Sequence, residues 1–162
     1  MKRFILPVLV LVAAIAFGVW WFSPTHVLKR RTRSLLRTLT LEAASGKAAR
    51  QMGSYSLNAI LAPRVSLESA DIPEANGDFD RTELESSFSW LCEQVKQSRF
   101  DLVEFRAVKI DGDEADVDFT LDALVQLPAQ RVVDGRYDAT FHWQRKDHVW
   151  LLSRAKWVKA GH

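Results

Sequence analysis

A strict alternation of apolar and polar side chains between residues 115 and 127 is the feature that most constrains the fold of this chain. Apolar side chains take every second position, namely Ala115, Val117, Phe119, Leu121, Ala123, Val125 and Leu127. The intervening polar positions are Asp116, Asp118, Thr120, Asp122 and Gln126. Only Leu124 breaks the pattern. Because successive side chains of a strand point to opposite faces, this segment is predicted to be a strand with one buried face and one polar face.

The same period of two continues toward the end of the chain. Residues 136–145 alternate polar side chains with Tyr137, Ala139, Phe141 and Trp143, and residues 148–159 form one more predicted strand. Residues 100–110 form the strand before them. Turn-forming residues at 111–113 and 146–147 separate neighbouring strands. The C-terminal part of the chain is therefore predicted to be an antiparallel meander.

Helical periodicity dominates before residue 100. A first amphipathic helix is expected over residues 25–45 and begins near Pro24, because proline is well accommodated in the first helical turn. A second helix is expected over residues 47–61, followed by a short strand at 65–68 and a polar loop at 71–80. Helices followed by a meander indicate an α+β fold.

The third predicted helix has the clearest N-terminal signal. Asp80 or Thr82 can cap it, and Glu83 or Glu85 stands three residues later, as a capping box requires. One face of this helix repeats apolar side chains at Leu84, Phe88, Leu91 and Val95. Trp90 lies away from this stripe and is expected either at a layer edge or in a pocket or interface.

An apolar segment of 19 residues without charge, Phe4–Phe22, stands near the N-terminus. As a helix it would span about 28 Å, close to the roughly 30 Å hydrocarbon core of a bilayer. Trp20 and Trp21 fall at its end, where aromatic residues meet the interface. The segment is predicted to be a retained anchor over residues 1–24. The alternative is a cleaved signal peptide with Ala14-Ile15-Ala16 as the cleavage site.

Positive charge is concentrated beside this segment. Residues 1–50 hold nine basic residues and one acidic residue, a net charge of +8, so the rest of the chain carries −6 of the formal total of +2. The membrane-contact candidates on the first helix are Lys29, Arg30, Arg33 and Arg37, which suit anionic lipid headgroups, although a solvated face is the alternative. Nucleic acid is not expected as a partner, because the domain beyond the first helix is acidic.

The layout resembles the nuclear transport factor 2-like superfamily, a cystatin-like α+β cone. The resemblance rests on the helix over residues 80–98, on the strand pair around LVEFRAVKIDGDEADVDFTL, and on the closing strand VWLLSRA at 149–155. It implies helices packed into the concave face of a curved antiparallel sheet over roughly residues 27–159. The chain looks like membrane-anchored bacterial members of unassigned function, with residues 46–162 completing one domain after the basic helix.

A single-pass arrangement in a bacterial inner membrane follows from the anchor. A short basic start followed by an apolar run favours a domain outside the cytoplasm. The basic residues after the segment favour the opposite orientation. The side of the membrane on which the domain lies therefore stays open.

No catalytic residue is predicted. Enzymes of the superfamily that this chain resembles place acids, bases or histidines on positions that face the pocket of the cone. The inward faces of residues 115–127 and 136–145 offer neither a carboxylate nor a histidine. No metal or cofactor is expected, because His142 stands alone on a shallow outer face and the glycines do not form a phosphate-binding loop. Cys92, the only cysteine, is expected to be a small core residue.

Two functional hypotheses follow. In the first, the polar outer face of the sheet, with Asp118, Thr120, Asp138 and His142 as interface candidates, pairs the domain with a second copy as a homodimer or with another envelope protein. In the second, the pocket candidates Tyr55, Trp90, Tyr137 and Trp143 line a cone that takes a small apolar ligand or an isomerase- or hydrolase-like substrate. The same aromatic side chains could instead simply fill the cone.

Overall fold

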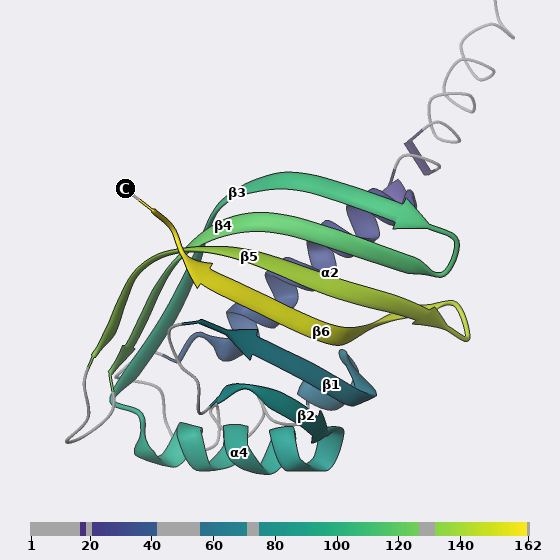
Figure 1. The fold of residues 1–162 in the computed structure, drawn as a ribbon. Coiled ribbons are helices and arrows are strands. Elements are labelled where there is room, and N and C mark those ends of the chain that lie inside the picture. The colour runs from purple at the N-terminus through teal and green to yellow at the C-terminus, as the bar shows by residue number, and fades with distance from the viewer. Residues whose placement is uncertain (1–16, 19–20, 42–55, 71–74, 127–131, 162) are drawn as a thin grey trace, which may run out of the picture.

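One strongly curved six-stranded sheet organises the protein (Figure 1). The computed structural model describes residues 17–18, 21–41, 56–70, 75–126 and 132–161. The elements in chain order are α2 (Pro24–Leu39), β1 (Leu61–Ser69), β2 (Gly77–Asp80), α4 (Arg81–Gln94), β3 (Gln97–Asp111), β4 (Glu114–Gln126), β5 (Val133–Lys146) and β6 (Val149–Lys159). The strands lie in the order β2-β1-β6-β5-β4-β3.

The predicted meander is confirmed. Strands β3, β4, β5 and β6 pair antiparallel with their neighbours in sequence. The turn between β3 and β4 contains Gly112 with a φ of 59°. β1 joins the far side of β6 in parallel, and β2 forms the short edge beyond β1.

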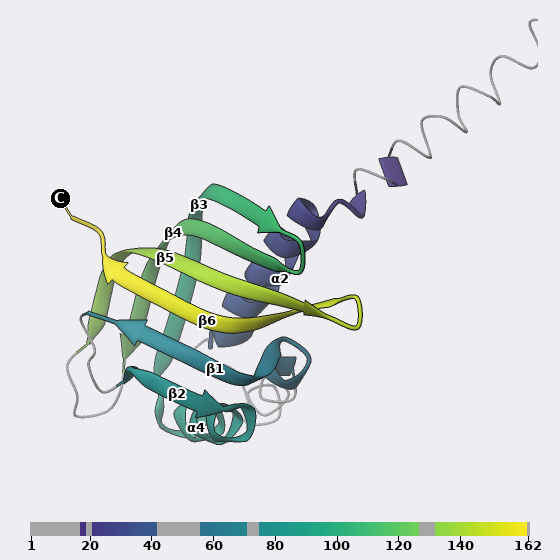
Figure 2. The same ribbon diagram turned by 45° about the vertical axis from the view of Figure 1, so that its right-hand side comes forward.

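The helices lie on different parts of the sheet. α2 crosses behind β3–β6, and α4 lies beside β1 and β2; both views agree on this arrangement (Figures 1 and 2). α2 turns Leu28, Thr32, Leu35 and Leu36 inward. We call the sheet face that packs toward α2 the inner face and the opposite one the outer face.

α4 begins with the capping box that its sequence predicts. The Asp80 side chain accepts a hydrogen bond from the backbone of Glu83, and the Glu83 carboxylate accepts one from the backbone N–H of Asp80 at 2.8 Å. These bonds satisfy amide groups that have no partner within the helix.

Large side chains fill the inner face. Val117, Phe119 and Trp143 are completely buried, and Tyr137 and Phe141 are nearly so. The rings of Phe119 and Phe141 meet edge to face with centroids 4.8 Å apart, and those of Phe141 and Trp143 lie 6.4 Å apart. Edge-to-face contacts of this kind add to the stabilisation from apolar burial.

Several sequence-based boundaries were wrong. The third predicted helix, expected over residues 80–98, ends at Gln94, because residues 97–98 already pair with β4 as the start of β3. The first helix ends at Leu39, because Thr40 is extended and Leu41 pairs with Ser98 of β3. Leu61 begins β1 and does not end a helix; most of that predicted helix lies outside the described residues. Residues 77–80, expected in a loop, form β2, because β1 offers them a strand to pair with.

Most of the predicted membrane segment, like Tyr55 of the predicted pocket, lies outside the described residues. No helix in the described part of the chain combines the length and the apolar character needed to cross a membrane.

The β5–β6 turn yields a stability prediction. Its residues Asp147 and His148 have φ values of 50° and 65°, a conformation that disfavours residues other than glycine by about 1–2 kcal/mol. We expect His148→Gly to raise the free energy of unfolding by about 0.5–1 kcal/mol. The reason is that removing backbone strain from the folded state stabilises the protein by more than the extra conformational entropy of glycine stabilises the unfolded chain. Chemical denaturation measures the change. His148→Ala is the control and should give no such gain; equal stability of the two variants would contradict the explanation.

Candidate functional site

Polar side chains on the outer face form a ladder between β4 and β5. The register places Asp116 opposite His142, Asp118 opposite Thr140, Thr120 opposite Asp138 and Asp122 opposite Arg136. Each opposed pair is hydrogen-bonded, and the shortest distance in each pair lies between 2.7 and 2.9 Å. The alternation that buries the apolar side chains thus also brings these polar side chains together.

Strand β3 adds cations to this ladder. Its pairing with β4 shifts register between Leu102 and Glu104 and again between Phe105 and Ala107. Arg106 lies within the second irregularity, and its guanidinium forms an ion pair of 2.7 Å with the Asp138 carboxylate. The Lys109 ammonium lies 3.8 Å from the Asp118 carboxylate. Bulges of this kind redirect side chains, which is how β3 contributes Arg106.

The electrostatics keep the acids ionised. Hydrogen bonds from Arg106 and then Thr120 lower the pKa of Asp138, and the pKa of Arg106 is raised mainly by its bond to the same carboxylate. Arg136 lowers the pKa of Asp122 in the same way, through a two-fold contact with its guanidinium. Asp138 and Asp122 are therefore carboxylates at neutral pH, with no proton to donate.

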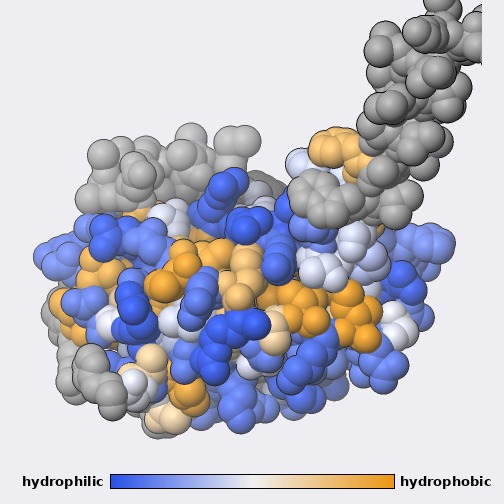
Figure 3. Space-filling model, turned by 90° about the horizontal axis from the view of Figure 1, so that it is seen from above, coloured by the Kyte–Doolittle hydropathy of each residue, from blue (hydrophilic) through white to orange (hydrophobic). Residues whose placement is uncertain are grey.

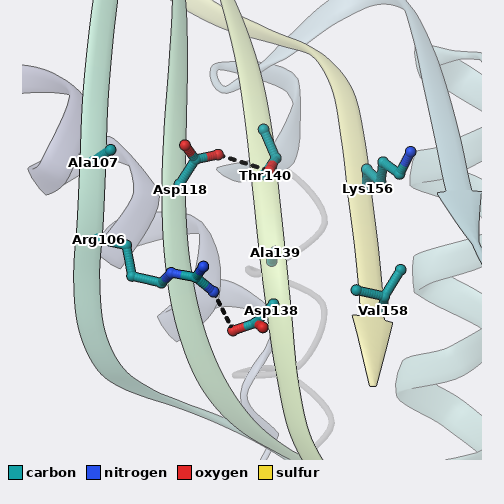
Figure 4. Close-up of a pocket in the computed structure, with 8 residues that line it drawn as sticks. All are labelled: Arg106, Ala107, Asp118, Asp138, Ala139, Thr140, Lys156 and Val158. Carbon is teal, nitrogen blue, oxygen red and sulfur yellow. Dashed lines mark hydrogen bonds and ion pairs between the residues drawn. The ribbon is translucent and has the colours of Figure 1, made fainter. Parts of the chain in front are cut away.

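A depression of about 560 Å³ lies within this network (Figure 4). Its lining comes from four strands and consists of Arg106, Ala107, Asp118, Asp138, Ala139, Thr140, Lys156 and Val158. Asp118, Asp138 and Thr140 occupy the centre, with Arg106 on the β3 side and Lys156 on the β6 side. The depression suits a polar side chain or small charged group that enters from outside.

The sequence-based interface candidates gather on this face. Asp118 and Asp138 line the depression, Thr120 donates to Asp138 at 2.9 Å, and His142 Nδ1 lies 2.7 Å from Asp116. His142 is thus a cross-strand polar residue, as expected. Within the described ranges no cluster of three or more metal-ligating side chains occurs.

The pocket candidates do not converge among the described residues. Trp143 and Tyr137 belong to the core, with exposed fractions of 0% and 5%, whereas Trp90 on α4 is 54% exposed. None of the three lines the depression. The aromatic side chains of β5 therefore fill the inner face, which is the alternative that the sequence left open.

The membrane-contact candidates on α2 lie at its surface. The Lys29 ammonium and the Arg33 guanidinium stand over the ring of Phe105 in β3, at 5.3 and 4.9 Å from its centroid. Arg30 stacks on Trp21 at 4.5 Å, and Arg37 is exposed in the last turn.

Sequence reasoning missed Arg106 and Lys156 as members of the site. Lys156 faces outward beside Thr140 because of its register in β6. The signal for Arg106 was the interrupted alternation in residues 102–107, where a perfect strand would keep a period of two.

Comparison with known proteins identifies the fold. An uncharacterised protein from Caulobacter vibrioides with a cystatin-like fold superposes with a TM-score of 0.65 at 12% identity, covering 85% of this chain and 89% of its own. A protein of the NTF2-like family from Streptomyces avermitilis, named provisionally as a dehydratase, gives 0.57 at 16% identity, covering 83% and 94%. The CaMKII hub of S. rosetta gives 0.59 at 17% identity, covering 85% and 98%.

The fold is that of nuclear transport factor 2-like, cystatin-like proteins. No model of a protein family and no curated protein matches the sequence. These three structures are described as an uncharacterised protein, a provisionally named dehydratase and a CaMKII hub. Proteins with this fold therefore differ in function, and the fold alone does not fix the function of this chain.

The lowered pKa values predict how stability depends on pH. Asp122 and Asp138 stabilise the folded state above their unfolded pKa, near 4, and lose that contribution as the pH falls through the lower folded values. We expect the free energy of unfolding to fall between about pH 5 and pH 2, and to fall less in the double variant Asp122→Asn/Asp138→Asn. Denaturant titrations across this range measure the difference.

The matched control is Asp111→Asn/Asp134→Asn, which removes two exposed carboxylates with no ion pair in the described structure. Its acid dependence should follow that of the unaltered protein. If both double variants lost the same amount of acid sensitivity, the ion pairs of Asp122 and Asp138 on the outer face would not be the source of the acid sensitivity.

Proposed function

We propose that this protein is a membrane-tethered, non-enzymatic interaction domain that pairs with a second copy of itself through the outer face of its sheet. The observation that carries the proposal is the network of paired charges around the 560 Å³ depression on that face. The opposite face is filled by Phe119, Phe141 and Trp143, so it gives no comparable support to a ligand-binding cone.

The state of the acids favours association over catalysis. A general base is most effective when its pKa lies near the operating pH, whereas hydrogen bonds from Arg106 and Thr120 lower the pKa of Asp138 and make it a weaker base. Charges that are already paired within one copy can be covered without leaving an isolated buried charge, whose cost would be large. Their fixed positions also reduce the side-chain entropy lost on binding.

The arrangement of charge suits a two-fold interface. Carboxylates of Asp118 and Asp138 lie at the centre, between Arg106 on β3 and Lys156 on β6. Arg154, also on the outer side of β6 and exposed, has no ion pair among the described residues. Rotation about a two-fold axis near the centre would bring cations of one copy over carboxylates of the other, as a self-complementary interface requires. The likeness to a hub protein supports association between copies.

The tether completes the proposal. The apolar run Phe4–Phe22 would hold α2 and the sheet at a bacterial inner membrane, with the domain on the outer side. Confinement to one surface raises the effective concentration of copies, so that a modest interface suffices.

Filling the depression should prevent pairing. Ala107 lines it with a small side chain, and Ala107→Arg would add bulk and charge there. We expect the purified full-length protein in neutral detergent to change from dimer to monomer, measured as protein mass by light scattering, with unchanged helix and strand content by circular dichroism.

Ser87→Arg is the control, because it adds the same side chain at an exposed position of α4. This variant should remain dimeric. A monomeric unaltered protein at concentrations of tens of micromolar, or a dimeric Ala107→Arg variant, would overturn the proposed interface.

Protease accessibility tests the topology. With the domain outside the cytoplasm, protease added to spheroplasts should degrade residues 25–162, whereas intact cells should protect them. Degradation only after lysis would place the domain on the cytoplasmic side.

A further inference from the structure

Positive charge on α2 has no ion-pair partner in the part of the domain that the structure describes. The helix carries Lys29, Arg30, Arg31, Arg33 and Arg37 and no acidic residue. Among the described residues none of these five forms an ion pair, whereas Asp118, Asp122 and Asp138 on the outer face each have a cation within 4 Å. An uncompensated cationic surface attracts an anionic partner.

One of the five cations has an internal role. Arg31 is half-buried and donates from Nη1 to the backbone oxygen of Ala59 at 3.2 Å, and burial lowers its pKa. Arg31 therefore joins α2 to the segment before β1. Of the other four, Arg33 and Arg37 are exposed, and Lys29 and Arg30 are partly exposed. We call these four, together with Trp21 and Phe22, the α2 docking surface.

Two cations of this surface are held in place by an aromatic ring. Lys29 and Arg33 are four residues apart, so they share one side of the helix. Both stand over Phe105, at 5.3 and 4.9 Å from the ring centroid. The negative face of the ring offsets part of the repulsion between the two like charges. The pair is thus oriented before any anion binds.

Aromatic side chains just before α2 continue the surface. Trp21 and Phe22 are 44% and 73% exposed, and Arg30 stacks on Trp21 at 4.5 Å. On β3, two apolar side chains are exposed, Val103 and Ile110. In the view from above, hydrophobic side chains are interleaved with hydrophilic ones over the top of the domain (Figure 3). Aromatic and basic side chains side by side are typical of residues at a membrane–water interface.

We infer that the α2 docking surface binds anionic phospholipid headgroups, with Lys29 and Arg33 on phosphate oxygens and Trp21 and Phe22 at headgroup depth. The inference rests on the tether of the proposed function, which brings this surface to the bilayer. The acidic character of residues 51–162 disfavours a nucleic acid, which would be repelled by the rest of the domain. Docking would give the sheet a fixed orientation relative to the membrane.

Lipid selectivity of the full-length protein tests the inference. The chain is reconstituted into phosphatidylcholine vesicles that contain trace spin-labelled phosphatidylglycerol or phosphatidylcholine, and electron paramagnetic resonance measures the fraction of each lipid immobilised by protein. We expect a preference for phosphatidylglycerol of about fivefold, which decreases at high salt. Lys29→Gln/Arg33→Gln should abolish most of it.

Two further variants separate charge from folding. Arg64→Gln/Arg99→Gln removes the same charge from exposed positions of β1 and β3 that pair with Asp80 and Asp101, and it should retain the preference. Lys29→Arg/Arg33→Lys exchanges the two cations and should retain the preference for phosphatidylglycerol as well.

Equal immobilisation of the two lipids, or a preference that survives Lys29→Gln/Arg33→Gln, would overturn the inference while leaving the tether intact. Loss of the unaltered chain from vesicles in a high-salt wash would overturn the tether and the inference together.

Discussion

Burial of the apolar face of β4 and β5 against α2 is the interaction on which the rest of the structure depends. Val117, Phe119 and Trp143 are completely buried on that face, and α2 covers it with Leu28, Leu35 and Leu36. Because side chains alternate along a strand, a slip of one residue in either strand would expose this whole set. The register between β4 and β5 is therefore fixed by the core, even though its most visible consequences lie on the opposite face of the sheet.

Those consequences are the paired charges of the outer face. Once Val117 and Phe141 are opposed in the core, Asp116 must face His142 and Asp118 must face Thr140 on the other side. The arrangement of polar groups around the depression thus follows from hydrophobic packing, with the bulges of β3 adding Arg106. Side chains that already have partners in the free protein lose less conformational entropy when another molecule covers them.

The two proposed surfaces differ in how their charge is balanced. On the outer face, carboxylates find cations within the same copy, so that a second copy with the same pattern can cover them. On α2, Lys29, Arg30 and Arg33 lie over aromatic rings and form no ion pair among the described residues, so we propose that an external anion balances their charge. One domain can therefore present a membrane surface and a protein surface at the same time, because they use different elements.

The sequence by itself determined the α+β class, the meander, the capping box at Asp80 and Glu83, and the inward or outward direction of most side chains in β4 and β5. These features depend on local periodicity and on neighbours within a few residues. Only the tertiary structure decided that residues 77–80 pair with β1, that Arg106 reaches Asp138 and that Lys156 stands beside the same depression. It also decided that Tyr137 and Trp143 are buried in the core and stand apart from that depression. Each of these outcomes depends on which distant strands become neighbours and where their register shifts, and no periodicity within a single segment encodes that pairing.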